Sequence, residues 1–123
     1  MTINEAIGRV DALKFNTCPQ GEKIRWLSEL DGSIKHSIID RHEGGGGAFA
    51  GYDSNTDGNT VLLVPAPFDV VYLRWLEAQI DYHNGEFDRF NAAIVLYNTA
   101  YEAFANHYKQ THKPVAKGCR FVF

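Results

Sequence analysis

The acidic run from Asp53 to Asp57 is the first segment whose residue types could do chemistry. Asp53, Asn55 and Asp57 have the spacing D-x-N-x-D and precede Gly58, which matches the opening of a calcium-binding loop. That loop also needs a bidentate glutamate at its twelfth position, where this chain has Val64. The three residues are therefore weak candidates for a metal site. A solvated turn, which Asp and Asn favour, is the preferred interpretation.

Three other patterns lack residues that their chemistry requires. The run from Gly44 to Gly47 has neither the lysine of a phosphate-binding loop nor the G-x-G-x-x-G spacing of a dinucleotide site. The histidines form no H-E-x-x-H pair, and His36 and Asp40, one helical turn apart, are interpreted as a surface pair. No serine lies in a G-x-S-x-G context. We therefore expect no enzymatic activity, no metal and no cofactor.

The composition narrows the class of protein. The chain has 123 residues, enough for one domain with a core of its own, and a formal net charge of −3. This charge argues against a free nucleic-acid binder, which needs a basic face. No apolar stretch approaches the roughly 18 residues of a membrane span. The first residues do not resemble a signal peptide, so we expect the protein to begin in a cytoplasm, with Cys18 and Cys119 reduced.

Apolar residues recur at helical spacing in four segments. They predict helices over about residues 3–13, 19–41, 68–83 and 86–111. Thr2 and Glu5 have the spacing of a capping box at the start of the first helix. Thr17 is expected to cap the second helix, with Pro19 in its first turn. The sequence thus predicts a mainly α protein.

The fourth segment carries the most regular pattern in the chain. Its large apolar residues are spaced alternately by three and four, as in a heptad seam: Phe87, Phe90, Ile94, Tyr97, Tyr101, Phe104 and Tyr108. We expect this seam to form the core. The preceding Asn84-Gly85 is a helix stop, which favours an antiparallel hairpin, although one continuous helix over 68–112 is the alternative.

The segment from 42 to 67 lacks helical spacing. It is rich in glycine, and we expect a flexible loop inserted into a single domain that spans residues 1–123. Residues 48–52 and 60–64 could form a short β-hairpin around the Asp57-Gly58 turn. The overall prediction is a small helical bundle with a long antiparallel helix hairpin and a glycine-rich central loop.

Aromatic residues suggest an interface. Tyr72, Trp75 and Tyr82 lie away from the Leu73–Ile80 face of the third predicted helix, so we expect an exposed aromatic patch. The C-terminal residues are also apolar and could add a strand within this chain or onto a neighbour: Phe121, Val122 and Phe123. We therefore expect protein partners and oligomerisation.

Several segments of the chain together resemble a known family. The segments are Ile3–Glu5, Val10–Asn16, Lys23–Gly32 (KIRWLSELDG), Leu62–Phe68 (LLVPAPF), Tyr72–Asp81 (YLRWLEAQID) and Asn84–Asn91 (NGEFDRFN). The chain is similar to small proteins encoded among the head genes of tailed phages and prophages of gut Firmicutes. These resemble head–tail connector (neck adaptor) proteins, and the similarity covers nearly the whole chain.

The resemblance implies a structural role rather than catalysis. Such adaptors are helical bundles that assemble as a ring, commonly of twelve copies, on the portal protein, and they offer a docking surface to the next neck or tail protein. The ring encloses DNA without binding it specifically, which agrees with an acidic balance. The expected location is the host cytoplasm during assembly and then the virion, with no membrane contact. The resemblance brings no catalytic residues.

Two other functions remain open at this stage. One is a phage-encoded helical interaction or regulatory module that binds a host or phage protein and has no place in the particle. The other is a calcium-dependent or hydrolytic module built on Asp53 and Asp57. We expect particle composition to separate the first from an adaptor, and calcium titration to test the second.

Overall fold

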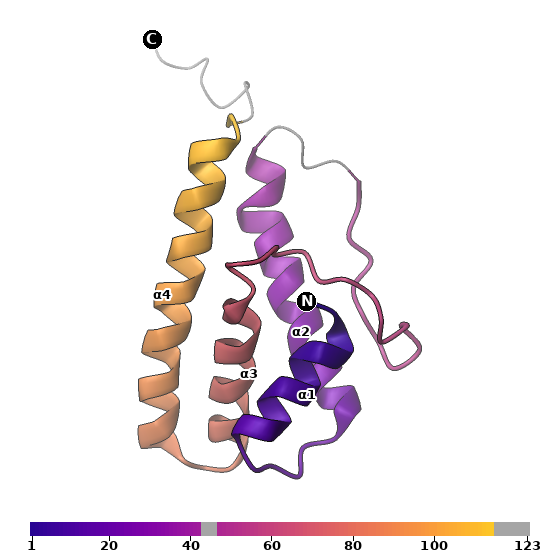
Figure 1. The fold of residues 1–123 in the computed structure, drawn as a ribbon, viewed down its shortest axis with the longest axis vertical. Helices are drawn as coiled ribbons and strands as arrows, with labels where there is room; N and C mark the ends of the chain where they lie inside the picture. Colours follow the sequence, from indigo (N-terminus) through magenta and orange to yellow (C-terminus); the bar gives the residue numbers. More distant parts are fainter. Residues whose placement is uncertain (43–46, 115–123) are drawn as a thin grey trace.

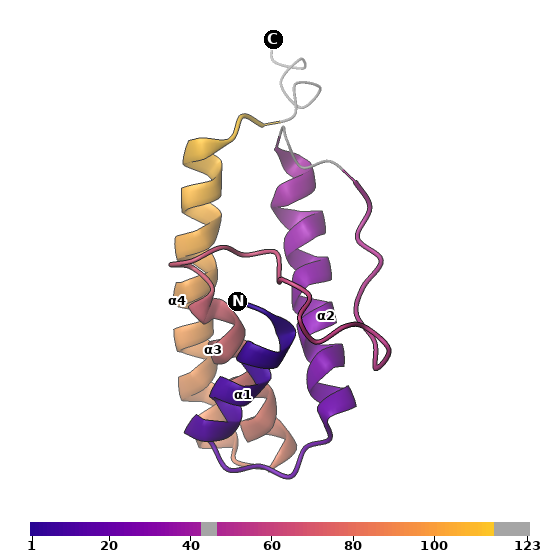
Figure 2. The same ribbon diagram turned by 45° about the vertical axis from the view of Figure 1, so that its right-hand side comes forward.

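The computed structural model describes residues 1–42 and 47–114. Its helices are α1 (Ile3–Leu13), α2 (Gln20–Ser37), the short 3₁₀ helix η1 (Ile39–Arg41), α3 (Val70–His83) and α4 (Phe87–Thr111). Consecutive α-helices run antiparallel, and the connections α1–α2 and α3–α4 lie at the same end of the bundle (Figures 1 and 2). The fold is a mainly α helical bundle, as the sequence predicts. Among the described residues, no helix combines the length and apolar character that a membrane span requires.

The start of α1 confirms the predicted capping box. The backbone N–H of Glu5 donates to Thr2 Oγ1 at 3.2 Å, and the backbone N–H of Thr2 donates to Glu5 Oε1 at 2.9 Å. These bonds satisfy two donors that a helix start otherwise leaves unpaired. The α2 helix begins differently, because its N-cap is Pro19 and no side chain caps it. The expected cap by Thr17 is therefore wrong, although the start of the helix was predicted to within one residue.

The turn between α3 and α4 confirms the predicted hairpin. Gly85 has a φ of 76°, in the left-handed region that glycine enters without strain. Its N–H donates to the carbonyl of Tyr82 at 3.1 Å, and the N–H of Asn84 donates to that of Ile80 at 2.9 Å. The helix therefore ends at His83, and α4 returns along α3 (Figure 1).

Within the bundle, α3 is the central helix and α4 the peripheral one. The α3 helix packs against α1, α2 and α4, whereas α4 packs chiefly against α3. Of the heptad seam of α4, only Phe104 is fully buried, at 2% exposure, and Phe87 is 58% exposed. The expectation that this seam forms the core is thus confirmed only in part, because Tyr97, Tyr101 and Tyr108 pack against the core while half-buried. The core lies among α1, α2 and α3, and the α4 seam covers one side of it.

The segment between η1 and α3 is packed against the bundle from residue 58 to 64. Leu62 and Val64 are buried, and the N–H of Leu62 donates to the carbonyl of Met1 at 2.9 Å. Val61 pairs with Thr2 in an isolated antiparallel bridge, so the described residues form no β-hairpin here. These contacts correct the expectation of a flexible loop for this part. Residues 43–46, which include most of the glycine run, lie outside the described residues.

Gly58 is where this segment comes closest to α1. A Cβ at residue 58 would lie 2.4 Å from the side-chain atoms of Asn4, and the carbonyl of Gly58 accepts the N–H of Asn4 at 2.9 Å. Only glycine leaves room for this approach without movement of the Asn4 side chain. The sequence feature that suggested a hairpin turn therefore serves to fasten the segment to α1.

Candidate interaction surfaces

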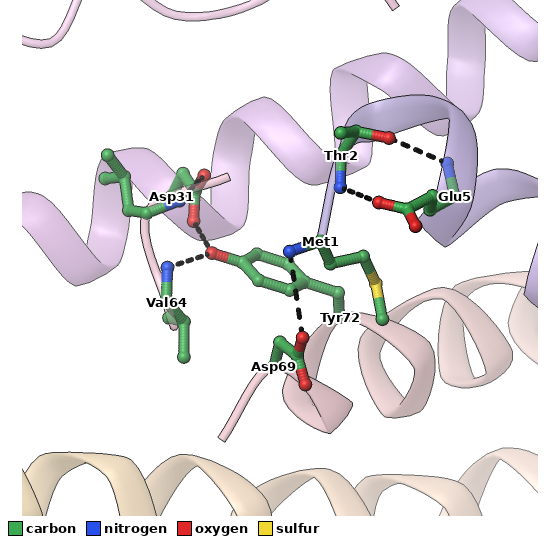
Figure 3. A network of polar contacts seen from close by, with 8 residues as sticks. Met1, Thr2, Glu5, Asp31, Val64, Asp69 and Tyr72 are labelled. Atoms are coloured by element: carbon green, nitrogen blue, oxygen red, sulfur yellow. Dashed lines mark hydrogen bonds and ion pairs between the residues drawn. The ribbon is translucent and has the colours of Figure 1, made fainter. Parts of the chain in front are cut away.

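Tyr72 lies in the core rather than on an aromatic patch. Its exposure is 0%, and its hydroxyl donates to Asp31 Oδ1 of α2 at 2.6 Å. The backbone N–H of Val64 donates to the same hydroxyl at 2.7 Å. Figure 3 shows the ring reaching from α3 to both partners. The predicted exposure of Tyr72 is therefore wrong, because a buried tyrosine with two hydrogen bonds links α2, α3 and the segment between η1 and α3.

Asp31 is the acceptor on which this network converges. Its carboxylate also accepts the Tyr52 hydroxyl at 2.6 Å and the Leu63 N–H at 3.1 Å. Burial raises the pKa of Asp31, and the hydrogen bonds from Tyr52 and Tyr72 act in the opposite direction. Burial, with Asp31 beside them, also raises the pKa of both tyrosines. The group links α2, α3 and the segment between η1 and α3.

The first residue of the chain lies beside this network. The Met1 amino nitrogen is 3.7 Å from Asp69 Oδ2, just before α3 (Figure 3). Together with the capping box and the bridge to Val61, this ion pair fixes the start of α1 against the segment that leads into α3.

Trp75 is half-buried between helices. Its indole N–H donates to the carbonyl of Trp26 at 2.9 Å, and its ring centroid lies 4.9 Å from that of Tyr97 on α4. The predicted patch on the outer side of α3 is in fact where α2 and α4 pack. Trp75 contributes to the bundle and has only part of its surface left for a partner.

Tyr82 is the one residue of the predicted aromatic patch that is largely exposed. It lies near the end of α3 with 59% of its surface accessible. Its ring makes edge contacts with Phe87 and Phe90 of α4, at centroid distances of 5.6 and 5.3 Å. Tyr82 thus belongs to an aromatic cluster beside the α3–α4 turn.

Other exposed apolar residues lie at the same end of the bundle. Leu13 is 64% exposed, and Phe15, in the α1–α2 connection, is 87% exposed. We call this end of the bundle, with its exposed apolar residues, the apolar end: Leu13, Phe15, Tyr82 and Phe87. Leu13 and Phe15 follow the apolar residues of α1 in the sequence at roughly helical spacing. The spacing of Ile3, Ile7 and Val10 continues to residue 14, which is lysine, so both residues lie off the stripe.

A second exposed apolar surface lies on α4. Val95 is 61% exposed and Leu96 is 52% exposed, on the side of the helix away from α3. The sequence from residue 90 to residue 101 contains no charged residue, so neither side of these three turns is strongly solvated. We call this the outer face of α4, defined by Val95 and Leu96. The sequence pattern pointed to the opposite, inner side of the same helix.

A shallow cleft opens between α2 and α3 close to the apolar end. It has a volume of about 410 Å³ and is lined by Glu22, Arg25, Trp26, Gln79, Tyr82 and His83. Arg25 is already ion-paired with Glu22 and with Glu29, the latter at 3.0 Å. Arg25 and Glu22 are therefore already ion-paired. Neither has a free charge with which to bind a small ion in the cleft.

The weak metal candidates use their oxygens locally. Asp53 Oδ1 accepts the Asn55 N–H at 2.8 Å, and Asp57 Oδ1 accepts the Asn59 N–H at 2.9 Å. Both are turns in which an aspartate binds its own backbone two residues ahead. Within residues 1–42 and 47–114, no group of three or more His, Cys, Asp or Glu side chains is arranged to hold a metal ion.

The C-terminal residues of the predicted interface lie outside the part of the chain that is described. These are Phe121, Val122 and Phe123, and Cys119 falls in the same stretch. Of the remaining predicted interface residues, Tyr72 lies in the core, Trp75 lies between helices, and Tyr82 lies at the apolar end. Comparison with family models, with curated proteins and with solved structures finds no match to this chain.

Proposed function

We propose that this protein is a head–tail adaptor of a tailed phage or prophage, which assembles as a ring under the portal and joins the capsid to the tail. The observation that carries the proposal is that the bundle exposes large apolar side chains in two separate places, at the apolar end and on the outer face of α4. An adaptor has to contact its neighbours in the ring and also the proteins above and below it. Exposed apolar surfaces of this kind mark protein interfaces.

Two further features agree with this role. The net charge of −3 suits a ring that encloses DNA without binding it specifically. The C-terminal residues Phe121 to Phe123 are apolar, and we assign them to contacts with a neighbouring copy or with the portal. The proposal places the protein in the host cytoplasm during assembly and then in the virion, without an enzymatic activity, cofactor or metal of its own.

The composition of purified particles tests the proposal. Phage particles from a strain that encodes this chain are purified on a density gradient and examined by quantitative mass spectrometry. We expect this protein at a copy number close to that of the portal protein. Its absence from particles that contain the portal would contradict the proposal and favour the second function, a phage-encoded regulatory module that binds a host protein.

Electron microscopy gives an independent test. The purified protein is mixed with its own portal rings, and we expect an added ring of density on one face of the portal. A variant with Val95→Lys and Leu96→Lys alters only exposed positions of α4, and it should fold yet weaken the ring. Unchanged rings from this variant would exclude the outer face of α4 as a ring contact.

A further inference from the structure

The outer face of α4 belongs to a longer exposed strip on that helix. Three small side chains continue it at helical spacing, and all three are exposed: Ala92, Thr99 and Ala103. Residues three, four or seven positions apart lie on one side of a helix, so the strip is a single surface of about three turns that includes Val95 and Leu96. The described residues leave it uncovered, because α4 packs chiefly against α3. Small side chains beside larger apolar ones allow an extended segment to lie close to the helix.

The residues after Pro114 have properties that complement this strip. We call residues 115–123 the C-terminal segment, which contains the apolar sequence FVF at residues 121–123. It also contains two basic residues, Lys117 and Arg120, and no Asp or Glu. Such a segment matches a surface that is apolar and bordered by negative charge.

Glu102 supplies a negative charge at one border of the strip. It is the only Asp, Glu, Lys or Arg from residue 90 to residue 108, it is exposed, and it forms no ion pair with the described residues. The basic residues of the C-terminal segment are attracted to it at short range. With Arg120 beside Glu102, the three apolar residues that follow extend towards Leu96. Charge therefore favours an orientation in which the segment runs antiparallel to α4.

The last described residue, Pro114, lies on the inner side of α4. Pro114 pairs with His42 in an isolated antiparallel bridge, and the ring of His42 makes an edge contact with that of Tyr108 at a centroid distance of 5.3 Å. Tyr108 belongs to the seam that packs against the core. The C-terminal segment therefore begins between the ends of η1 and α4, not on the outside of α4.

This starting point keeps the apolar residues of the segment away from the strip of their own copy. Leu96 precedes Thr111, the last residue of α4, by 15 residues, which is about 22 Å along the helix, and it lies about a third of a turn from Tyr108 around the axis. A chain that passes around the helix about 10 Å from its axis travels about 30 Å to reach it. Phe121 follows Pro114 by seven residues, which span at most about 25 Å. Only another copy can therefore bring Phe121 onto Leu96.

We propose that the C-terminal segment of one copy binds the outer face of α4 on a second copy. The apolar residues 121–123 pack on Val95 and Leu96, and Arg120 pairs with Glu102. Because the two surfaces in this contact differ, it is heterologous, and it can repeat from copy to copy around a closed ring. The place of this contact in a ring rests on the proposed function, whereas the contact itself is a property of the chain.

Disulfide cross-linking between two forms of the full chain tests the proposal. One form, the acceptor, carries Ala103→Cys and Cys119→Ser, and the other, the donor, is the wild-type chain with Cys119 in its C-terminal segment. A disulfide between positions 103 and 119 then necessarily joins two copies, and Cys18 is only 7% exposed. After mild oxidation at about 0.5 mM protein, which populates a weak contact, we expect this disulfide in the mass spectrum of proteolytic peptides.

Ala92→Cys takes the place of Ala103→Cys in a control acceptor, because it adds an exposed thiol at the other end of the same strip. A disulfide forms only where the two Cβ atoms approach to about 4 Å, so the proposed orientation should give at least about tenfold less cross-link from position 92.

Val95→Lys together with Leu96→Lys gives a sharper test. In the acceptor, this pair should lower the 103–119 cross-link at least about tenfold, because two charges replace the apolar contact and face Arg120. In the donor, the same pair should leave the cross-link unchanged, since the donor contributes only its C-terminal segment. Both positions are exposed, so unchanged helical circular dichroism shows that the acceptor still folds.

Two results would overturn the proposal. One is a 103–119 cross-link no stronger than that from position 92, and the other is a cross-link that the lysine pair in the acceptor does not lower. Cross-linking as expected, combined with absence of the protein from purified particles, would support the contact and contradict the proposed function.

Discussion

Of the two helices of the hairpin, α4 has the more regular apolar pattern in the sequence, yet α3 is the more deeply buried. Seven of the 14 residues of α3 are buried, against two of the 25 residues of α4. The more regular apolar seam belongs to α4, yet α3 is the helix that contacts the other three. A regular seam indicates only that a helix has one apolar side. How much of that side is buried depends on how many elements pack against the helix.

A helix with one neighbour can bury only a narrow stripe. Phe104 lies where α4 also meets Phe68, just before α3, at a ring distance of 6.2 Å. Phe87, on the same seam, lies at the apolar end and is 58% exposed. Buried and exposed positions therefore differ along α4 itself, as they do between α3 and α4. Substitutions can test each of these differences.

The largest effect is expected at Phe104. Phe104→Ala removes a buried ring and leaves a cavity, which should lower the free energy of unfolding by about 3–5 kcal/mol. Phe87→Ala, on the same seam, should change it by less than about 0.5 kcal/mol because Phe87 is largely exposed. Urea denaturation followed by circular dichroism measures both. Similar losses for the two variants would show that the whole seam is buried.

A leucine pair compares the two helices directly. Leu76 of α3 is 0% exposed, and Leu76→Ala should lower the free energy of unfolding by about 2–5 kcal/mol. Leu96→Ala on the outer face of α4 should cost less than about 0.5 kcal/mol, because it removes no packed contact. The same denaturation experiment applies. A costly Leu96→Ala would mean that the outer face of α4 is covered in solution.

Tyr72 of α3 and Tyr97 of α4 allow the two helices to be compared by removal of a single hydroxyl group. Tyr72→Phe deprives Asp31 of one donor and the Val64 N–H of its acceptor, and it should cost about 1–3 kcal/mol. Burial raises the pKa of Tyr97 to about 12, but its hydroxyl has no hydrogen bond to the described residues. Tyr97→Phe should therefore be nearly neutral. Equal effects in thermal denaturation would argue against a special role of the Asp31 network.

The smallest effect concerns pH. Burial raises the pKa of Asp31 above its ordinary 3.8, so the folded chain binds a proton there more readily than the unfolded chain does. The contribution of Asp31 to stability is therefore greatest at low pH and declines as pH rises through the folded pKa. Asp31→Asn lacks this titration. We expect the wild type minus Asp31→Asn difference in unfolding free energy to fall as the pH rises above 3.8, the ordinary pKa of the group.

Urea titrations of both proteins across this pH range provide the measurement. The subtraction is needed because other carboxyl groups act in the opposite sense. The pKa of Glu22 is lowered chiefly by its hydrogen bond with Arg25, for example, and its contribution is lost as pH falls. A difference that rises with pH would mean that the three hydrogen bonds to Asp31 outweigh its burial.

Local signals account for what the sequence predicted well. The bounds of α1 agree with the prediction because Thr2 and Glu5 satisfy the first donors of the helix. The α3–α4 hairpin follows from the asparagine and glycine at residues 84 and 85, where the chain enters a positive φ. Each of these depends on residues only a few positions apart, and such interactions can be read from one segment.

Which side chains of the candidate interface are exposed depends on contacts between residues far apart in the chain. The sequence predicted these contacts poorly. Tyr72 was expected at the surface, but its partner Asp31 lies 41 residues earlier in the chain. The apolar end combines Phe15 and Tyr82, which no local pattern connects. Tyr82 was predicted to be exposed because it lies away from the Leu73–Ile80 face of α3, and the structure confirms this for Tyr82 alone.

The sequence by itself determined that the chain is mainly helical, the bounds of α1, and the turn at Asn84-Gly85 that ends α3 and starts the return of α4. Capping, glycine turns and apolar spacing act within a few residues, so they operate before distant parts of the chain meet. Only the tertiary structure decided that α3 is central, that α4 is peripheral, and that apolar side chains remain exposed at one end. Burial depends on which elements surround a side chain, and those neighbours lie far away in the sequence.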